Sequence, residues 1–142
     1  MAFTVREFDH VGTARDFGRV AAEALDLDPD RVFKTLIVAA DGALAVAIVP
    51  VSCQLSLKAV AAALGAKRAE LGDPAVAERT TGYVVGGISP FGQRRRLPTV
   101  IDETCELFDV IYVSGGRRGL DLGVAPCDLV AVTGAVVAAI TA

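Results

Sequence analysis

The chain has few of the residues on which most protein nucleophiles and metal centres depend. It contains a single histidine, His10, and three scattered cysteines without a Cys-x-x-Cys pair. One histidine cannot form a histidine metal cluster, and it disfavours a Ser-His or Cys-His catalytic pair. An odd number of separated cysteines argues against a disulfide framework or a thiolate metal site. We therefore expect neither a metal nor a cofactor, and we interpret Cys53 and Cys105 as small packing residues.

Long apolar runs and an excess of positive charge are also absent. No run approaches the length of a transmembrane helix, and the N-terminus has no basic region followed by an apolar one. These absences predict a cytoplasmic protein without a membrane partner. The formal net charge of −3 does not suit a general nucleic-acid coat, so contact with nucleic acid requires a local basic patch. The length predicts a single domain, 1–142, whose core must consist mainly of aliphatic residues because aromatics are only 6%.

Hydrophobic periodicity and turn residues predict strands and helices that are interspersed along the chain. Strands are expected at residues 3–8, 32–40, 43–49, 83–85, 99–102, 110–113, 120–124 and 136–140. Helices are expected after caps at Thr13 and Ser56, from Asp73 to about Arg79, and at 126–132. Asp41-Gly42 predicts a tight hairpin. This order indicates an α/β or α+β fold with one mixed, barrel-like sheet and helices packed outside it.

The stretch from Gly82 to Arg96 holds the strongest local signal for a binding loop. Residues 83–85 suit a buried strand, and the pair Gly86-Gly87 then allows backbone angles that a Cβ would forbid. Glycines at a strand end can also direct their N–H groups toward a ligand oxygen. Ser89 adds a hydroxyl, and Pro90 fixes the direction in which the chain leaves. The alternative is a tight turn without a ligand, followed by solvated arginines.

A second stretch repeats this pattern after the predicted strand 110–113. It reads Ser114-Gly-Gly-Arg-Arg, so a strand is again followed by a glycine pair and then by arginines. Two such loops would form two walls of one anion-binding pocket. If the loops are neighbours, their basic residues form a local patch for nucleic acid; otherwise these residues only keep the surface soluble. The basic residues are Arg94, Arg95, Arg96, Arg117 and Arg118.

Two charged residues lie on predicted strands. Lys34 interrupts an apolar strand, so its amine either faces solvent or enters a polar pocket. In a pocket, its three donors would suit a phosphate or a carbonyl oxygen that gains negative charge. Asp121 follows the second glycine pair and has two readings: it binds an amine or a hydroxyl, or it pairs with an arginine.

The chain resembles the YbaK family in six blocks, which occur in the family's order. They are Arg31-Val-Phe-Lys-Thr-Leu, Gln54-Leu-Ser-Leu-Lys, Leu64-Gly-Ala-Lys, Thr81-Gly-Tyr-Val-Val-Gly-Gly-Ile-Ser-Pro-Phe-Gly-Gln, Leu97-Pro-Thr-Val-Ile-Asp and Ile111-Tyr-Val-Ser-Gly-Gly-Arg-Arg-Gly-Leu. A single Gly-Gly-Ile-Ser-Pro would be weak evidence, whereas collinear blocks across nearly the whole chain are strong evidence. The resemblance implies a mixed α/β, barrel-like domain related to the editing domain of bacterial prolyl-tRNA synthetases.

The resemblance also implies roles for individual residues. The lysine of the family's Phe-Lys-Thr motif is the key pocket residue and corresponds to Lys34, and the catalytic glycine loop corresponds to Gly86 and Gly87. Phe8 stands where the family usually has a tyrosine, so the hydroxyl is missing there. The arginines of the two loops are expected to contact tRNA. Substrate-binding positions are expected at Phe8, Phe17, Thr35, Ile88, Ser89, Pro90, Ser114, Gly115, Gly116 and Asp121.

The activity that the resemblance implies is hydrolysis of mischarged aminoacyl-tRNA, typically Cys-tRNA(Pro), as a step of translation fidelity. The substrate's own thiol would attack its ester carbonyl, and the protein would position the group and stabilise the oxyanion. Water would be the nucleophile for alanine or serine substrates. Expected partners are the tRNA acceptor end and prolyl-tRNA synthetase. Two rival functions remain open: a module that binds aminoacyl-tRNA or a synthetase without hydrolysis, and a hydrolase of small aminoacyl esters without tRNA.

Overall fold

The computed structural model describes residues 1–9 and 17–142, so His10 and the predicted cap Thr13 lie outside the described residues. The strands are β1 (Phe3–Glu7), β2 (Phe33–Ala40), β3 (Ala43–Pro50), β4 (Ala69–Leu71), β5 (Thr99–Asp102), β6 (Ile111–Arg117), β7 (Leu120–Val124) and β8 (Val136–Ala138). The helices are α1 (Phe17–Ala24), α2 (Leu57–Ala63), α3 (Pro74–Thr81) and α4 (Pro126–Thr133), with a short 3₁₀ helix, η1 (Glu103–Leu107). In the described part, no helix is long and apolar enough to cross a membrane.

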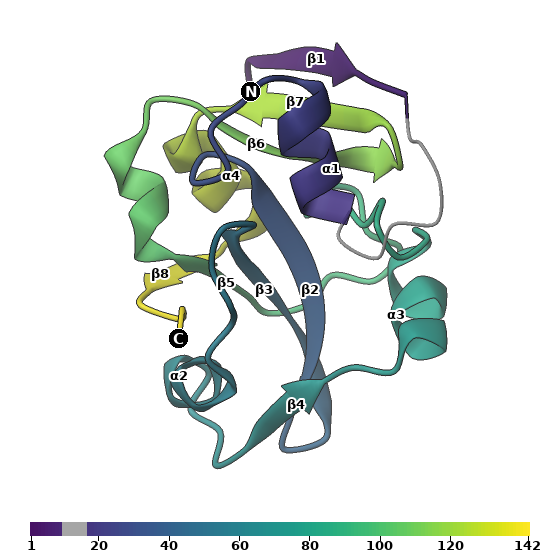
Figure 1. Ribbon diagram of the computed structural model, residues 1–142. Coiled ribbons are helices and arrows are strands. Elements are labelled where there is room, and N and C mark those ends of the chain that lie inside the picture. The colour runs from purple at the N-terminus through teal and green to yellow at the C-terminus, as the bar shows by residue number, and fades with distance from the viewer. Residues whose placement is uncertain (10–16) are drawn as a thin grey trace.

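The strands form two sheets, which confirms the predicted mixed α/β class but not a single sheet (Figure 1). The larger sheet has the order β4-β2-β3-β5-β8 and contains both antiparallel and parallel pairs. The smaller sheet, β1-β7-β6, is antiparallel. An isolated bridge between Val32 and Tyr112 joins the two sheets beside the start of β2. The two sheets are thus linked at one point and do not close into a barrel.

Local turn and cap signals are confirmed. Asp41 and Gly42 take positive φ values of 49° and 83° and link β2 to β3 in a two-residue turn. The Ser56 hydroxyl accepts a hydrogen bond from the Ala59 N–H at 3.1 Å and caps α2. Asp73 caps α3 in the same way, through the Ala75 N–H at 2.8 Å. Each signal needs only residues close in sequence, which is why the sequence sufficed to predict it.

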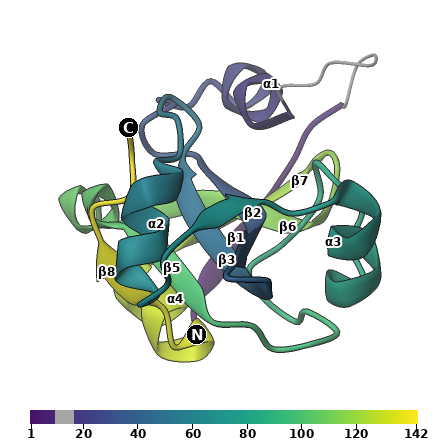
Figure 2. The same cartoon turned by 90° about the horizontal axis from the view of Figure 1, so that it is seen from below.

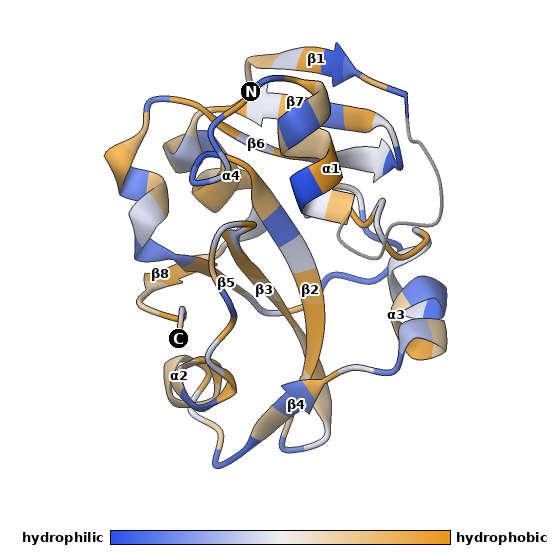
Figure 3. Ribbon diagram, viewed as in Figure 1, coloured by the Kyte–Doolittle hydropathy of each residue, from blue (hydrophilic) through white to orange (hydrophobic). Residues whose placement is uncertain are grey.

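The β2–β3 hairpin separates the two larger apolar clusters of the core, and a smaller one contains Ala22, Val32 and Val51. Phe33 and Ile37 on β2 belong to the cluster that packs toward β6, β7 and α4. Val38 belongs to the cluster under α2, with Leu36 packed against it. Figure 3 shows the apolar character of β2, interrupted by one hydrophilic band where the strand carries its single charged residue, Lys34. The alternation along β2 thus sets which side chains can reach the space beside α1.

The predicted strand at 83–85 is wrong, because these residues form a loop anchored to α3. Gly82 ends α3 with a φ of 83° and turns the chain. The Tyr83 hydroxyl then donates to the Phe91 carbonyl at 2.6 Å, and the Val85 N–H donates to the Glu78 carboxylate at 2.9 Å. These hydrogen bonds hold residues 83–85 in a loop that pairs with no strand, although their residue types favour a strand.

The predicted loop at the second glycine pair is also wrong, since Gly115 and Gly116 belong to β6. The register of β6 against β7 shifts between Ser114 and Arg117, so the two glycines form a bulge inside the strand. Gly116 has a φ of 112°, a value that favours glycine. The turn between the strands comes later, at residues 118–119.

The cysteines lie away from any reactive cluster in the described part of the chain. Cys105 is fully buried in the core, and burial raises the pKa of its thiol to about 11, which confirms its packing role. Cys53 is half-buried and lies 3.7 Å from the Ser52 hydroxyl. Among the described residues, no group of three or more potential ligands could hold a metal ion.

Candidate active site

A cavity of about 550 Å³ lies where β2, α1, the β6–β7 sheet and the loop after α3 meet. In Figure 1, α1 lies in front of the β6–β7 sheet, and Figure 2 shows that the helix stands clear of it. The volume is in the usual range for a small-molecule site. The predicted site residues among its described lining are Phe8, Phe17, Lys34, Thr35, Gly86, Ile88, Ser114 and Asp121.

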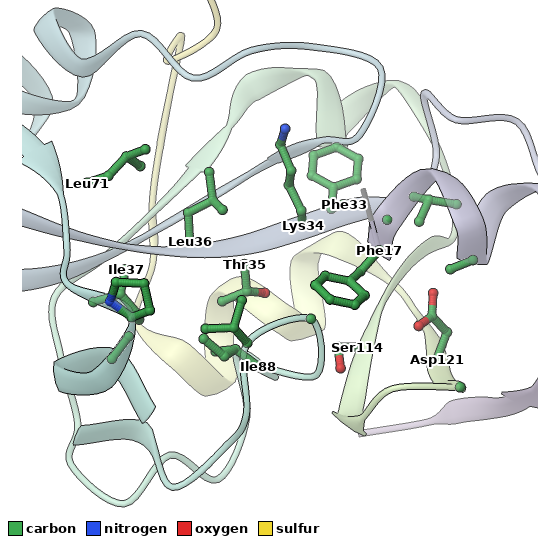
Figure 4. Close-up of a pocket in the computed structure, with 18 of the residues that line it drawn as sticks. Phe17, Phe33, Lys34, Thr35, Leu36, Ile37, Leu71, Ile88, Ser114 and Asp121 are labelled. Atoms are coloured by element: carbon green, nitrogen blue, oxygen red, sulfur yellow. The ribbon is translucent and has the colours of Figure 1, made fainter. Parts of the chain in front are cut away.

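The cavity opens beside β2 because one edge of that strand is unpaired over its first half. β4 pairs only with Val38–Ala40 of β2, and the Gly72 N–H adds one hydrogen bond to the Ile37 carbonyl. Residues 33–36 therefore present a free edge toward the cavity. Lys34 is half-buried and lines this edge, and it points to the opposite side of β2 from Thr35 (Figure 4). Lys34 thus contributes to the cavity lining while its amine is turned away from the Thr35 side, and both readings of Lys34 stay open.

The Gly86–Gly87 loop can take its place only without side chains. Gly86 has a φ of 88°, and a Cβ there would lie 2.5 Å from Cγ of Phe17. A Cβ on Gly87 would lie 2.8 Å from the backbone of Arg117. The loop is thus pressed between the helix α1 and the end of β6. The two glycine-containing segments are neighbours, although the second one is a bulge.

The two glycines differ in the hydrogen bonds that their N–H groups make. The Gly87 N–H is donated to the Val84 carbonyl at 2.9 Å and closes the turn. The Gly86 N–H takes part in no hydrogen bond with a described residue, and Gly86 lines the cavity. In this structure, Gly86 is therefore the better placed of the two to donate to a ligand oxygen.

Arg118 connects the three elements around the loop. Its guanidinium carbon lies 4.4 Å from the centre of the Phe17 ring, a cation–π distance, and its Nε donates to the Val85 carbonyl at 2.9 Å. Arg117, next to it, is exposed and forms a surface ion pair with Glu7 at 3.5 Å. Arg118 thus contacts Phe17 and Val85, two residues that line the cavity, whereas Arg117 pairs at the surface.

We expect the two arginines to respond differently to substitution. Arg118→Ala should lower kcat for hydrolysis of aminoacyl-tRNA by about 10-fold or more, because a small displacement of the glycine loop misplaces its donor. Arg117→Ala, the matched control, should mainly raise KM. Arg118→Lys keeps the charge but loses the planar stack, so it should resemble Arg118→Ala. Steady-state kinetics of the three variants would test this, and full rescue by lysine would contradict it.

The β6–β7 wall places two oxygen-bearing side chains side by side. Asp121 on β7 lies opposite Ser114 of β6 in the register, so both side chains emerge on the same face of the sheet. Asp121 is only 6% exposed and forms no hydrogen bond or ion pair with a described residue. Burial raises the pKa of its carboxyl to about 7. Across the cavity, the buried Thr35 hydroxyl also has no hydrogen-bond partner.

The raised pKa of Asp121 makes the stability of the protein depend on pH. The folded-state pKa of about 7 exceeds the ordinary value of 3.8, so the folded state holds the proton more tightly and stability falls as pH rises between these values. The loss amounts to at most about 4 kcal/mol. Asp121→Asn should therefore raise Tm relative to wild type at pH 8 more than at pH 5. An equal difference in Tm at both pH values would contradict this account.

The other predicted site residues, all of them in the described part of the chain, do not line the main cavity. Ser89 is buried, and its hydroxyl accepts a hydrogen bond from the Phe91 N–H at 3.2 Å. Pro90 and Arg96 line a second, smaller cavity of about 170 Å³. Arg94 lies instead beside Gly82, at the end of α3. Arg94 and Arg96 thus lie against different parts of the structure. The predicted residues outside the main cavity are Gly87, Ser89, Pro90, Arg94, Arg95, Arg96, Gly115, Gly116, Arg117 and Arg118.

Sequence reasoning missed part of the apolar lining. Phe33, Ile37 and Ala77 also line the cavity. The period of two along β2 places Phe33 and Ile37 on the same side as Thr35, so that signal was present. No signal in the sequence pointed to Ala77 on α3.

Comparison with known proteins relates the chain to one family. The family described as the aminoacyl-tRNA editing domain matches residues 13–132. EbsC of Enterococcus faecalis, named as a candidate Cys-tRNA(Pro)/Cys-tRNA(Cys) deacylase, is 36% identical over 121 residues, which are 84% of this chain and 74% of that protein.

Solved structures share the fold. One described as a candidate trans-editing enzyme for prolyl-tRNA synthetase has a TM-score of 0.86 and 23% identity, covering 99% of this chain and 87% of that chain. The structure of hypothetical protein APE2540 has a TM-score of 0.87 and 25% identity, covering 100% of this chain and 93% of that chain. At 23% identity, the first match shows a shared fold only. Both matches agree with the two-sheet architecture described above.

Proposed function

The chain belongs to the aminoacyl-tRNA editing domain family, and on that premise we propose that it is a trans-editing deacylase for mischarged tRNA, with Cys-tRNA(Pro) as its substrate. The observation that carries the proposal is the cavity lined by Lys34 and by Gly86, whose N–H makes no hydrogen bond with a described residue. A cation and a backbone donor at one cavity suit an ester carbonyl that becomes an oxyanion. The relation to EbsC supports the choice of a cysteine substrate.

The reaction requires little from the protein if the substrate supplies the nucleophile. The thiol sulfur of the cysteinyl group attacks its own ester carbonyl, and the bond to the ribose oxygen breaks. The thiol proton passes to that oxygen, so the products are free tRNA and a cyclic thioester. This route suits a cavity whose described lining contains neither cysteine nor histidine. The protein then contributes position and oxyanion stabilisation through Gly86 and Lys34.

The tRNA body would lie outside the cavity, against exposed basic residues. Arg94, Arg95 and Arg117 are exposed, and Arg118 remains tied to Phe17. The net charge of −3 indicates weak intrinsic affinity for tRNA. Prolyl-tRNA synthetase is a suitable partner to supply the remaining affinity. The reaction belongs in the cytoplasm, where aminoacyl-tRNA is made and used.

The test is deacylation of Cys-tRNA(Pro) beside Ala-tRNA(Pro) and Ser-tRNA(Pro). Faster hydrolysis of the cysteine substrate than of the other two supports the proposal. A preference for alanine or serine would keep the site but require water as the nucleophile. If every substrate decays at the rate seen in buffer, the protein is a binding module rather than a deacylase.

A further inference from the structure

The main cavity carries one positive and one negative side chain among its described lining residues. Lys34 comes from β2, and Asp121 comes from β7 on the wall across the cavity (Figure 4). The rest of that lining is uncharged, and most of it is apolar or glycine. Such sites use a small number of polar groups to fix the orientation of a ligand. The negative charge on the β7 wall therefore indicates a ligand that presents a cation there.

The Asp121 carboxylate has no partner that explains its burial. It is 94% buried, since only 6% of the residue is exposed, and it forms no hydrogen bond or ion pair with a described residue. Arg6 lies opposite Asp121 in the register of β1, but its guanidinium carbon lies 5.9 Å from the Tyr112 ring centre. Lys34 points to the other side of β2 in Figure 4. A buried carboxylate in this situation calls for an explanation.

We propose that Asp121, with Ser114 beside it, forms the subsite for the α-ammonium group of the aminoacyl ester. The Ser114 hydroxyl accepts a hydrogen bond from the Gly116 N–H at 3.3 Å and has a second lone pair for the ammonium. An ammonium offers three donors, and a carboxylate and a hydroxyl on neighbouring strands can accept two of them. The inference rests on the proposed function, because it takes the ligand to be an aminoacyl ester.

The electrostatics of the wall agree with a cationic ligand. Burial without a counter-ion raises the pKa of the Asp121 carboxyl to about 7, so the site carries an unfavourable charge at neutral pH when it is empty. An ammonium would supply the missing opposite charge. The ester carbonyl is attached to the same carbon as the ammonium, so fixing the amine on this wall limits where the carbonyl can lie.

An ammonium subsite at Asp121 would decide which class of substrate the protein accepts. The protein should act on aminoacyl-tRNA with a free α-amine and reject N-acylated forms, a class that includes peptidyl-tRNA. Acylation removes the positive charge and adds volume beside Asp121. A site built around a buried hydrogen-bonding group discriminates strongly against a ligand that lacks the matching group. The discrimination is thus assigned to one wall of the cavity and not to the size of the amino-acid side chain.

The first test compares hydrolysis of Cys-tRNA(Pro) with that of N-acetyl-Cys-tRNA(Pro). Wild type should prefer the free amine by about 100-fold or more in kcat/KM. Asp121→Asn should lose most of its activity on the free amine and keep its low activity on the acetylated substrate, so that the preference collapses. The exposed Asp109→Asn is the matched control and should retain the wild-type preference. Equal losses on both substrates, or no preference in wild type, would overturn the inference.

The second test measures binding and does not depend on turnover. The probe is 3′-amino-3′-deoxyadenosine carrying alanine in amide linkage, with its α-amine either free or acetylated. Calorimetry should show tighter binding of the free amine to wild type, and equal binding of both forms to Asp121→Asn. If this difference is present while no tRNA is hydrolysed, the proposed function fails and the ammonium subsite stands. If tRNA is hydrolysed but the two probes bind wild type equally, the subsite fails alone.

Discussion

Gly86→Ala is expected to lower the rate of Cys-tRNA(Pro) deacylation by about 100-fold or more. The new Cβ would lie 2.5 Å from Cγ of Phe17, and the residue would have to keep a φ of 88°. The Phe17 ring is also in contact with the Arg118 guanidinium, which would be disturbed if the ring moved. The loop must therefore move, and its N–H moves with it. Loss of one oxyanion donor typically costs 10²–10³-fold in rate.

Gly42→Ala is the matched control for the backbone strain in this experiment. Gly42 has a φ of 83°, close to that of Gly86, but nothing lies within 4 Å of the Cβ it would receive. Both variants should thus lose about 1 kcal/mol of stability from the positive φ, and only Gly86→Ala should lose activity. Single-turnover hydrolysis and thermal unfolding measure the two effects separately. If Gly86→Ala retained a third or more of the wild-type rate, Gly86 would not be the oxyanion donor.

The parts of the fold that the sequence predicted correctly depend on neighbours along the chain. Asp41 illustrates this, since it supports the hairpin through its own backbone conformation. Its side chain also accepts hydrogen bonds from the N–H groups of Lys67 and Arg68, which no local pattern indicated. Ser56 and Asp73 likewise cap helices through residues two or three positions ahead. All the residues that form such a turn or cap lie within a few positions of one another in the sequence.

The errors arose where distant contacts decide the conformation. Tyr83 and Val85 have the residue types of a strand, but the bonds to Phe91 and Glu78 hold them in a loop. The propensity for strand was real and was overridden by tertiary structure. The second glycine pair predicts a loop because glycine usually ends a strand, whereas Gly116 allows a bulge within β6.

For the candidate site too, the sequence identified the residues, but their surroundings depend on strand pairing. The sequence identified Lys34 and Asp121 as exceptions on apolar strands, because a charge in such a place is rare. Whether each one faces solvent or a cavity depends on the unpaired edge of β2 and on the pairing of β7 with β6. Neither pairing can be read from spacing. The orientation of Lys34 could therefore be described only with the fold in hand.

Lys34→Ala is expected to lower kcat/KM for Cys-tRNA(Pro) by about 100-fold or more. The Lys34 ammonium has no hydrogen-bond or ion-pair partner among the described residues. The free edge of β2 leaves its flexible stem room to bring the charge toward a ligand in the cavity. We infer that the ammonium stabilises the negative charge that develops on the ester carbonyl. Its loss should then act mainly on kcat, because the charge exists in the transition state and not in the bound substrate.

The controls for Lys34→Ala separate this role from a general effect of charge. Lys58 on α2 is exposed, so Lys58→Ala removes the same charge away from the cavity and should leave the reaction unchanged. Lys34→Met keeps most of the stem, so a loss equal to that of Lys34→Ala would assign the effect to the ammonium. Kinetics with Cys-tRNA(Pro) and binding of the adenosine amide probe measure the two contributions. If Lys34→Ala weakened binding of the probe and left kcat unchanged, Lys34 would hold the substrate, and the oxyanion would depend on the Gly86 N–H alone.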